Sequence, residues 1–312
     1  LDMDLSIKKL INDFSRDELM FEYHNKGLLR LTGKDSFKFL NGISSNEVKN
    51  LKGEQSISSL ILTNKGRILF HIEIYSDSPD LMFVVYDLVQ KEDIIGHLKK
   101  YRMSYKIEID DLDESLTIFK GRNLSKELFF KKFKSSQILE EKLSVFLVPN
   151  NKINSIKITL TNQNYYSAWK ILNGVPSSSK EITSKTIPIE ANMWSSISFT
   201  KGCYIGQETI ARIHYRGKIK RSLSCLNIDG KLGNEVDIFN SENKEIGIIT
   251  NSVYFASENN TLALAYIDDD QNHENNSLTV SNKVCTVVKN NYKIANEKLI
   301  KVYSDYIIIY FF

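Results

Sequence analysis

Apolar and polar positions alternate most regularly in the C-terminal part of the chain. From about Lys218 onward the alternation marks short strands separated by turns rich in Asn, Asp and Gly. These strands are expected at Leu223–Ile228, Glu235–Phe239, Ile246–Thr250, Leu262–Ile267 and Lys283–Val288. A period of two residues buries one face of a strand, and short strands at close spacing are typical of a small antiparallel barrel. We therefore expect a β-barrel over residues 218–290, followed by a tail over residues 291–312.

Residues 1–217 show helical and strand periods in turn. Apolar positions three and four residues apart predict helices near 7–14, 36–40, 94–101, 125–133 and 165–172. Apolar runs predict strands at 27–31, 68–75, 81–86, 105–109, 115–119, 144–148 and near 156–160. Thr32-Gly-Lys-Asp35 has the spacing of a capping box, and Gly174 is expected to end the last helix. The pattern predicts an α+β core of two similar subdomains.

Composition and charge narrow the class of protein. A hydrophobic content of 42% with 11% aromatic residues is that of a folded chain, and a net charge of +3 does not mark the whole chain as nucleic-acid-binding. The closing apolar run, Tyr306–Phe312, is too short to span a bilayer and is expected to be a terminal strand or a docking tail. Three cysteines without metal-binding spacing, and no targeting pattern, predict a cytoplasmic protein with reduced thiols, no metal site and no membrane contact.

A row of cations occupies every second position near the start of the expected barrel. Its members are Arg212, His214, Arg216, Lys218 and Lys220. In a strand this spacing would place the cations on one side, where they would repel each other unless an anion lay opposite. The row therefore has two interpretations, the wall of an anion-binding site and a solvated strand face.

Cys203 lies just before this row, between two glycines and close to Lys201. Most isolated cysteines are small core residues, and we favour that interpretation for Cys225 and Cys285, which lie in strand-like alternation. Around Cys203 the apolar neighbours of a core position are missing. A neighbouring ammonium would favour the thiolate, which is the nucleophilic and metal-binding form. Because one thiol cannot hold an iron–sulfur cluster, a second chain or a small thiol would have to complete any such site.

Glu190 lies in the apolar segment IPIEANMWSSISF. A carboxylate in such surroundings is either paired with a nearby lysine or arginine, or is available to accept hydrogen bonds from a ligand. The segment alone does not decide between these.

The segment KGCYIGQE, with WKILNGVP and IPIEAN before it and ARIHYRG after it, resembles the signature of the YgfZ-type folate-binding proteins. These are relatives of the glycine cleavage T-protein, an aminomethyltransferase. LLRLTGKDSFKFLNGISSNEV and NKGRILFHIEIY resemble the opening region of the same family. The likeness covers roughly residues 25–270, and KGCYIGQE is its most specific part.

The resemblance implies a T-protein-like fold, with a folate-binding α+β core around a central cavity and a C-terminal barrel. It implies tetrahydrofolate, or a one-carbon derivative, as cofactor and iron–sulfur client proteins as partners. Matched by position, Cys203 would be the functional thiol beside Lys201, and Glu190 would accept the adjacent N–H donors of a pterin ring. The other motif residues expected at the folate site are Tyr204, Gln207, Glu208, Arg212 and Arg216. The cations among them suit the anionic glutamyl tail of folate.

One departure from the aminomethyltransferase pattern affects the expected chemistry. In those enzymes the corresponding strand resembles GGxxDDL, whereas GRILFHI places Phe70 and His71 at the two acidic positions. Phe70 cannot act as an acid or a base, and at His71 we favour a strand histidine with a satisfied hydrogen bond. The leading hypothesis is therefore a folate-dependent accessory factor for the assembly or repair of iron–sulfur clusters. A folate-dependent aminomethyl transferase is the alternative, and an RNA-binding module that uses the basic row is a third.

Overall fold

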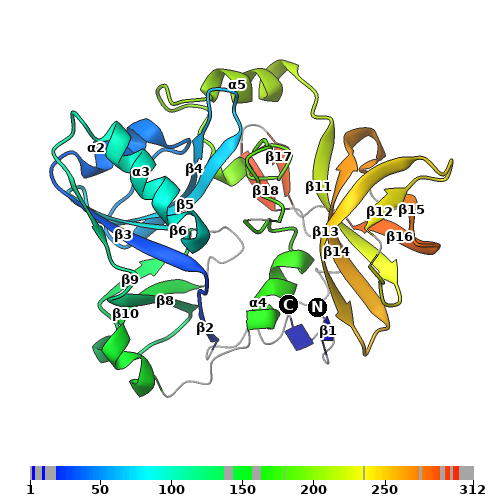
Figure 1. The fold of residues 1–312 in the computed structure, drawn as a ribbon, viewed down its shortest axis with the longest axis horizontal. Helices are drawn as coiled ribbons and strands as arrows, with labels where there is room; N and C mark the ends of the chain where they lie inside the picture. Colours follow the sequence, from blue (N-terminus) through cyan, green and yellow to red (C-terminus); the bar gives the residue numbers. More distant parts are fainter. Residues whose placement is uncertain are drawn as a thin grey trace. The chain divides into compact units, whose positions relative to one another are not determined.

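A computed structural model describes residues 2–3, 9–10, 19–136, 143–156, 163–178, 180–234, 236–273, 276–288, 292–295 and 298–301. The chain forms two compact units (Figure 1). Unit 1 comprises Leu1–Arg16, Asn164–Trp194 and Ile213–Phe312, and unit 2 comprises Asp17–Gln163 and Ser195–Arg212. Within the described residues, no helix combines the length and apolarity needed to cross a membrane.

An antiparallel sheet in the order β4-β5-β6-β3-β7 forms the centre of unit 2. Its strands are β3 Lys26–Thr32, β4 Gln55–Leu62, β5 Ile68–Ser78, β6 Leu81–Asp87 and β7 Glu108–Asp111. The helices α2 (Ser36–Ile43) and α3 (Lys91–Tyr101) pack their apolar residues against it (Figure 1). Phe39 and Leu98 of the helices share one buried cluster with Phe70 of β5. Because side chains alternate along a strand, the even-numbered residues of β5 face this core.

A smaller sheet, in the order β2-β8-β10-β9, contacts the odd-numbered face of β5. Its strands are β2 Met20–Glu22, β8 Leu116–Gly121, β9 Lys131–Lys134 and β10 Ser144–Pro149. The ring of Phe133 on β9 lies 5.3 Å from the ring of Tyr75 on β5, measured between centroids. Polar groups in the middle of this face, at Glu73 and Tyr75, are buried and need partners inside the protein.

Glu73 is such a residue, and it forms an ion pair with Lys120 of β8. The Lys120 Nζ lies 3.4 Å from the Glu73 Oε1, and both side chains are almost fully buried. The Tyr23 hydroxyl donates to Glu73 Oε1 at 2.9 Å, and the Tyr75 hydroxyl donates to Oε2. Lys120 Nζ also lies 3.9 Å from the centre of the Tyr23 ring. Burial alone would raise the pKa of Glu73, but Lys120 and the Tyr75 hydrogen bond outweigh it and hold that pKa well below its usual value.

The barrel expected from the alternating pattern is present in unit 1. Strand β14 pairs with both β11 and β13, which closes six antiparallel strands in the order β13-β12-β15-β16-β11-β14. They are β11 Arg221–Asp229, β12 Asp237–Phe239, β13 Glu245–Phe255, β14 Asn260–Asp268, β15 Ser277–Val280 and β16 Lys283–Val288. Cys225 and Cys285 are buried, as predicted, and burial raises the pKa of each thiol to about 12.

Short elements complete unit 1. β1 (Asp2–Met3) pairs in parallel with β13, and β17 (Tyr292–Ala295) pairs with β18 (Lys298–Lys301). Helix α4 (Gln163–Leu172) is followed by Gly174 at φ +66°, which confirms the predicted stop. Of the predicted helix near 7–14, residues 9–10 are described and are helical. Most of the strand predicted near 156–160 and the run Tyr306–Phe312 lie outside the described residues.

Two local predictions are wrong. The helix expected at 125–133 is a single 3-10 turn, Lys126–Leu128, followed by β9, because Phe133 packs between the sheets while Lys132 and Lys134 are exposed. The capping box at Thr32–Asp35 does not form, because the Asp35 carboxylate accepts a hydrogen bond from the Lys106 backbone instead of one at the helix start. The sequence did not predict the strands β1, β2, β4, β9, β15, β17 and β18.

Candidate functional site

The segment with the KGCYIGQE motif belongs to unit 2 and consists of a loop followed by a helix. We call residues Ser195–Gly206 the motif loop; helix α5 (Gln207–Arg216) follows it. The prediction of a strand through the basic row is therefore wrong. The sequence does carry helix signals: Ile210 is fully buried, Glu208 lies in the first turn, and His214 and Arg216 lie in the last turn, where they complement the helix dipole.

The helix separates cations that a strand would have aligned. Residues two apart on a helix point to nearly opposite sides, whereas Arg212 and Arg216, four apart, share a face. Both arginines are exposed, while the His214 ring contacts the Trp194 ring, with 5.6 Å between centroids. Lys218 and Lys220 lie beyond the end of the helix. The five cations therefore do not form one wall.

Hydrogen bonds fasten the start of the motif loop to β4 and to the end of α2. The Asn46 side-chain amide donates to the carbonyl of Ser195 at 2.7 Å, and the Ser45 hydroxyl donates to the carbonyl of Ser196 at 2.6 Å. The Ser196 hydroxyl is hydrogen-bonded to the Ser58 hydroxyl of β4 at 2.7 Å. All of these groups are buried or partly buried, so the chain enters the motif in a fixed position.

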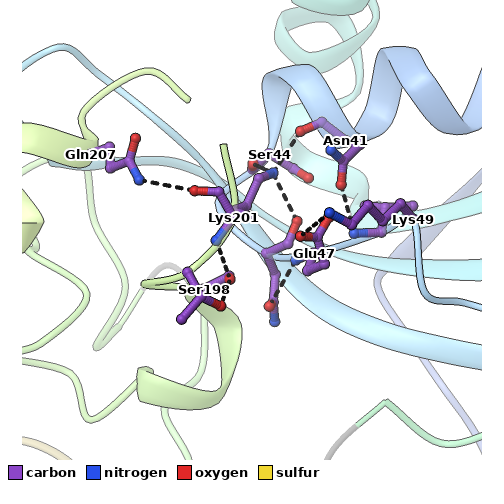
Figure 2. Close-up of polar contacts among 10 residues, drawn as sticks. Asn41, Ser44, Glu47, Lys49, Ser198, Lys201 and Gln207 are labelled. Carbon is purple, nitrogen blue, oxygen red and sulfur yellow. Dashed lines mark hydrogen bonds and ion pairs between the residues drawn. The ribbon is translucent and has the colours of Figure 1, made fainter. Parts of the chain in front are cut away.

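Lys201 makes the strongest attachment of the loop (Figure 2). Its Nζ donates to the backbone carbonyls of Asn41, Ser44 and Asn46, at 2.6, 2.7 and 2.9 Å. These carbonyls belong to the last turn of α2 and the loop after it, where helix carbonyls lack helical partners and the dipole favours a cation. Burial lowers the pKa of Lys201 to about 8, with Lys49 adding to the effect and Glu47 opposing it. The sequence placed this ammonium beside Cys203; in the structure it donates instead to one carbonyl of the last turn of α2 and to two in the loop after it.

Two glycines fix the end of the motif loop. Gly206 has φ +86°, and a Cβ built on it would lie 2.5 Å from the Thr63 carbonyl oxygen and 3.2 Å from the Cα of Gly66. Gly66, at φ +70°, forms the β4–β5 turn and would in turn meet the Thr209 side chain. Only glycine allows both this φ and this close approach at position 206.

Cys203 lies between these attachments and is the only exposed cysteine of the chain. Gly202 beside it faces open space. On its other side the Tyr204 ring is buried, with the Lys201 Nζ 5.4 Å from its centre. Gln207 donates to the Lys201 carbonyl at 3.4 Å (Figure 2), whereas Glu208 is exposed. The loop therefore presents one accessible thiol on a fixed backbone.

Glu190 lies in unit 1, in a turn held against the barrel. Its backbone carbonyl accepts a hydrogen bond from Leu223 of β11 at 2.7 Å, and the Asn192 side chain donates to the Leu223 carbonyl. Glu190 is 8% exposed, and the Arg221 Nε lies 3.5 Å from its Oε2. Within the described part of the chain, Oε1 makes no hydrogen bond. The carboxylate thus has a loosely held counter-ion and one open acceptor atom.

His71 and Phe70 occupy opposite faces of β5. Phe70 is 6% exposed and lies in the core beneath the helices. His71 Nε2 is hydrogen-bonded to the Ser58 hydroxyl at 2.9 Å, which joins the ring to Ser196 and the motif loop. Burial, reinforced by Lys26 and opposed by Glu73 and Asp87, lowers the pKa of His71 to about 4. Neither residue supplies the carboxylate expected of an aminomethyltransferase.

Sequence reasoning missed the residues that hold the loop. Backbone carbonyls carry no residue-type signal, so the contribution of Asn41 and Ser44 could not be seen in the sequence. Ser58 and Ser196 belong to no motif in the sequence, and only their hydrogen bond in the structure shows that they help to hold the loop. In the described ranges, His, Cys, Asp and Glu side chains do not gather in groups of three that could hold a metal ion.

Comparison with known proteins adds relatives in sequence and in fold. No protein-family model matches the chain. It is 24% identical over 244 residues to the iron–sulfur cluster assembly factor IBA57 homolog, mitochondrial, of Dictyostelium discoideum, which covers 64% of this chain and 60% of that protein. It is 28% identical over 226 residues to the tRNA-modifying protein YgfZ of Hamiltonella defensa, which covers 64% and 67%. The chain thus spans less than two thirds of the length of the Dictyostelium relative.

A solved structure shows the same fold. The glycine cleavage system aminomethyltransferase T from Bartonella henselae superimposes with a TM-score of 0.73 at 15% identity, over 89% of this chain and 88% of that one. At this identity the likeness establishes the fold. The α+β core and the C-terminal barrel expected from the sequence are therefore confirmed: the chain has the fold of the glycine cleavage T-protein and is similar in sequence to proteins named YgfZ and IBA57.

Proposed function

We propose that this protein is an accessory factor in iron–sulfur cluster assembly or repair, that it binds tetrahydrofolate, and that Cys203 is its functional thiol. The observation that carries the proposal is the exposed Cys203 on a loop attached on both sides. A thiol that reaches solvent from a fixed backbone can bind to, or exchange with, a group carried by another molecule. The relationship to proteins named as iron–sulfur assembly factors supports the same role.

The acidic and basic side chains expected for folate support the cofactor part of the proposal. Glu190 is almost buried, and its Oε1 is open to a donor. One carboxylate can accept two adjacent N–H donors of a pterin ring, which makes a charge-assisted bidentate contact. Arg212 and Arg216 share an exposed face of α5 and are suited to a glutamyl carboxylate. The bound folate would supply or accept a one-carbon unit, or would serve as a structural ligand.

Replacement of Cys203 tests the thiol. In cells that lack their own YgfZ-type protein, C203A is expected to abolish the support of iron–sulfur enzyme activity that the wild-type chain gives. The matched control is C225A, which removes a buried thiol of raised pKa and should retain that support. Full activity of C203A would refute the thiol part of the proposal.

Calorimetric titration with tetrahydrofolate tests the cofactor. E190Q keeps the shape of the side chain but loses the negative charge, and is expected to weaken binding by about tenfold or more, since hydrogen bonds to charged groups are the stronger ones. The E208Q variant, at an exposed position, controls for the loss of one charge. Equal affinity of wild-type and E190Q protein would remove Glu190 from the site.

Aminomethyl transfer on folate is the second candidate and rests on the shared fold. The buried Phe70 and the uncharged His71 at the positions of the acidic pair count against it. Formation of 5,10-methylene-tetrahydrofolate from an aminomethyl donor at high protein concentration would support transfer over the accessory role.

RNA binding is the third candidate, favoured by the exposed cations of α5 and by the name of the Hamiltonella relative. Phosphate contacts would make the affinity fall steeply as salt rises. An RNA affinity that hardly changes between low and moderate salt would exclude this mode.

A further inference from the structure

The three carbonyls that surround Lys201 have the features of a cation site. The oxygens of Asn41, Ser44 and Asn46 converge on one nitrogen at 2.6–2.9 Å (Figure 2). They come from a short stretch of backbone whose shape does not depend on Lys201 alone. The Asn41 side chain accepts a hydrogen bond from Val48, Ser44 caps the end of α2, and Asn46 bonds to Ser58 and Ser59.

Charge around the three carbonyls also favours a cation. They lie at the C-terminal end of α2, the negative end of the helix dipole. Glu47 follows directly, and its carboxylate raises the pKa of Lys201 against the effect of burial. The Glu47 Oε1 is buried and lacks a hydrogen-bond partner in the described structure, while Oε2 lies 3.4 Å from the exposed Lys49 Nζ.

The ligand set matches a monovalent rather than a divalent ion. Mg²⁺ requires octahedral coordination at shorter distances, and Ca²⁺ usually takes six to eight oxygens that include carboxylates. Neutral carbonyl oxygens replace the hydration shell of K⁺ in proteins, and ammonium donates to carbonyls as the lysine does.

We propose that the backbone around Asn41–Asn46, with Glu47 beside it, is a monovalent-cation site that the chain fills with its own side chain, and that Lys201 is thereby a positioning residue for the loop that presents Cys203. Lys201 is two residues from Cys203, so an empty site releases the thiol-bearing backbone from α2. The proposal rests on the proposed function only in taking Cys203 as the functional thiol. The cation site itself is independent of iron–sulfur chemistry.

Chemical rescue of K201A tests the site. We expect K201A in tetramethylammonium chloride, whose cation is too large to enter, to melt at a lower temperature than wild type. Amide hydrogen exchange in residues 41–48 and 196–206 should be faster by about tenfold or more, since charge-assisted hydrogen bonds are lost. Replacing the salt with ammonium or potassium chloride at equal ionic strength should restore both readouts as the ion concentration rises.

Three variants make the rescue specific. K201M fills the space with an uncharged side chain of similar length and should not be rescued. K49A removes the neighbouring exposed lysine, which contacts none of the three carbonyls, and should behave as wild type in all salts. The double variant K201A/E47Q lacks the nearby carboxylate and should need a higher potassium concentration than K201A.

The outcomes separate the cation site from the proposed function. Two results would overturn the proposal, whatever the activity of C203A. One is amide hydrogen exchange in K201A at the wild-type rate, and the other is a melting temperature of K201A that is equal in tetramethylammonium and potassium chloride. If K201A does not fold in any salt, reductive methylation of wild-type protein decides. Lys201 is expected to be methylated more slowly than Lys49. Equal rates would contradict the enclosure of the Lys201 ammonium by the three carbonyls. Loss of activity in C203A with normal rescue of K201A would affect only the thiol assignment.

Discussion

Unit 2 buries two lysines in the part that the structure describes, and it satisfies their charges by different means. Lys120 lies between two sheets and faces a carboxylate, Glu73, with the Tyr23 ring against its ammonium. Lys201 reaches from a loop to three backbone carbonyls and has no carboxylate within ion-pair distance among the described residues. An ion pair makes each charge depend on one other side chain, whereas a carbonyl cage depends on the course of the backbone. The first arrangement suits a core, and the second suits the attachment of a loop.

Loss of the lysine should destabilise the protein more at the ion pair than at the three carbonyls. K120M leaves the Glu73 carboxylate buried without its cation, and we expect a loss of about 3–5 kcal/mol in the free energy of unfolding. The double variant K120M/E73Q removes both charges and should recover a large part of that loss. Urea unfolding at neutral pH measures both. If single and double variants lose equal amounts, the pairing contributes little and the contrast with Lys201 fails.

Acid should weaken the region around the ion pair through His71. The pKa of His71 is about 4 in the folded protein, below its usual value of 6.5. Between those values the unfolded chain binds a proton that the folded protein does not. The free energy of unfolding therefore falls as the pH falls through this window, by roughly 2–3 kcal/mol from this group.

Urea unfolding at a series of pH values separates His71 from the carboxyl groups. H71Q can still bond to Ser58 but does not titrate, so its stability should change less between pH 6.5 and 4 than that of the wild type. H273Q is a matched control, because His273 is exposed. Its free energy of unfolding should change with pH as that of the wild type does. A wild-type slope in H71Q would assign the acid effect to other groups.

Gly206 holds the C-terminal end of the motif loop, and its contribution to stability can be compared with that of Lys201. G206A forces a Cβ against the Thr63 carbonyl at φ +86°, and we expect it to cost about 2 kcal/mol. G202A lies in the same loop, where an added Cβ would point into open space, and should change stability by less than about 0.5 kcal/mol. Thermal melting of the two variants tests whether the loop is held at both ends.

Removal of the thiol should have the smallest effect on stability. C203A changes an exposed side chain and is expected to shift the free energy of unfolding by less than about 0.5 kcal/mol. In the folded wild-type protein a thiol reagent should modify only Cys203, because Cys225 and Cys285 are buried with a pKa of about 12. Mass spectrometry after labelling checks this. A stability loss comparable to that of G206A would mean that Cys203 is part of the loop's attachment.

Sequence periodicity predicted those parts of the fold in which one face is buried and the other is not. The barrel strand β14 and the helix α3 have this form, and their positions were correct. Helix α5 was misread because its cations fall at alternate positions by coincidence, while its single buried residue, Ile210, carries a weaker signal. Strand β9 was missed because its one buried aromatic residue, Phe133, packs between sheets that are distant in sequence.

The candidate site was predictable in its side chains but not in its attachments. Resemblance to the YgfZ-type signature pointed to Cys203 and Lys201, and the exposure of the thiol agrees with the absence of apolar neighbours in sequence. The direction of the Lys201 side chain was not predictable, because its acceptors are backbone atoms more than 150 residues away. The Glu73–Lys120 pair depends in the same way on how two sheets are stacked.

The return of the chain to unit 2 at Ser195–Arg212 has a consequence for its biosynthesis. The ribosome makes Asp17–Gln163 of unit 2 before Asn164–Trp194 of unit 1, and Ser195–Arg212 only after both. When the carbonyls after α2 and the Ser58 hydroxyl are synthesised, their partners in the motif loop are therefore not yet translated. Since domains tend to fold from the N-terminus during synthesis, the nascent unit 2 stays open at this edge until Lys201 emerges. Cys203 follows two residues later. The thiol therefore takes its place on the attached loop only when unit 2 is being completed.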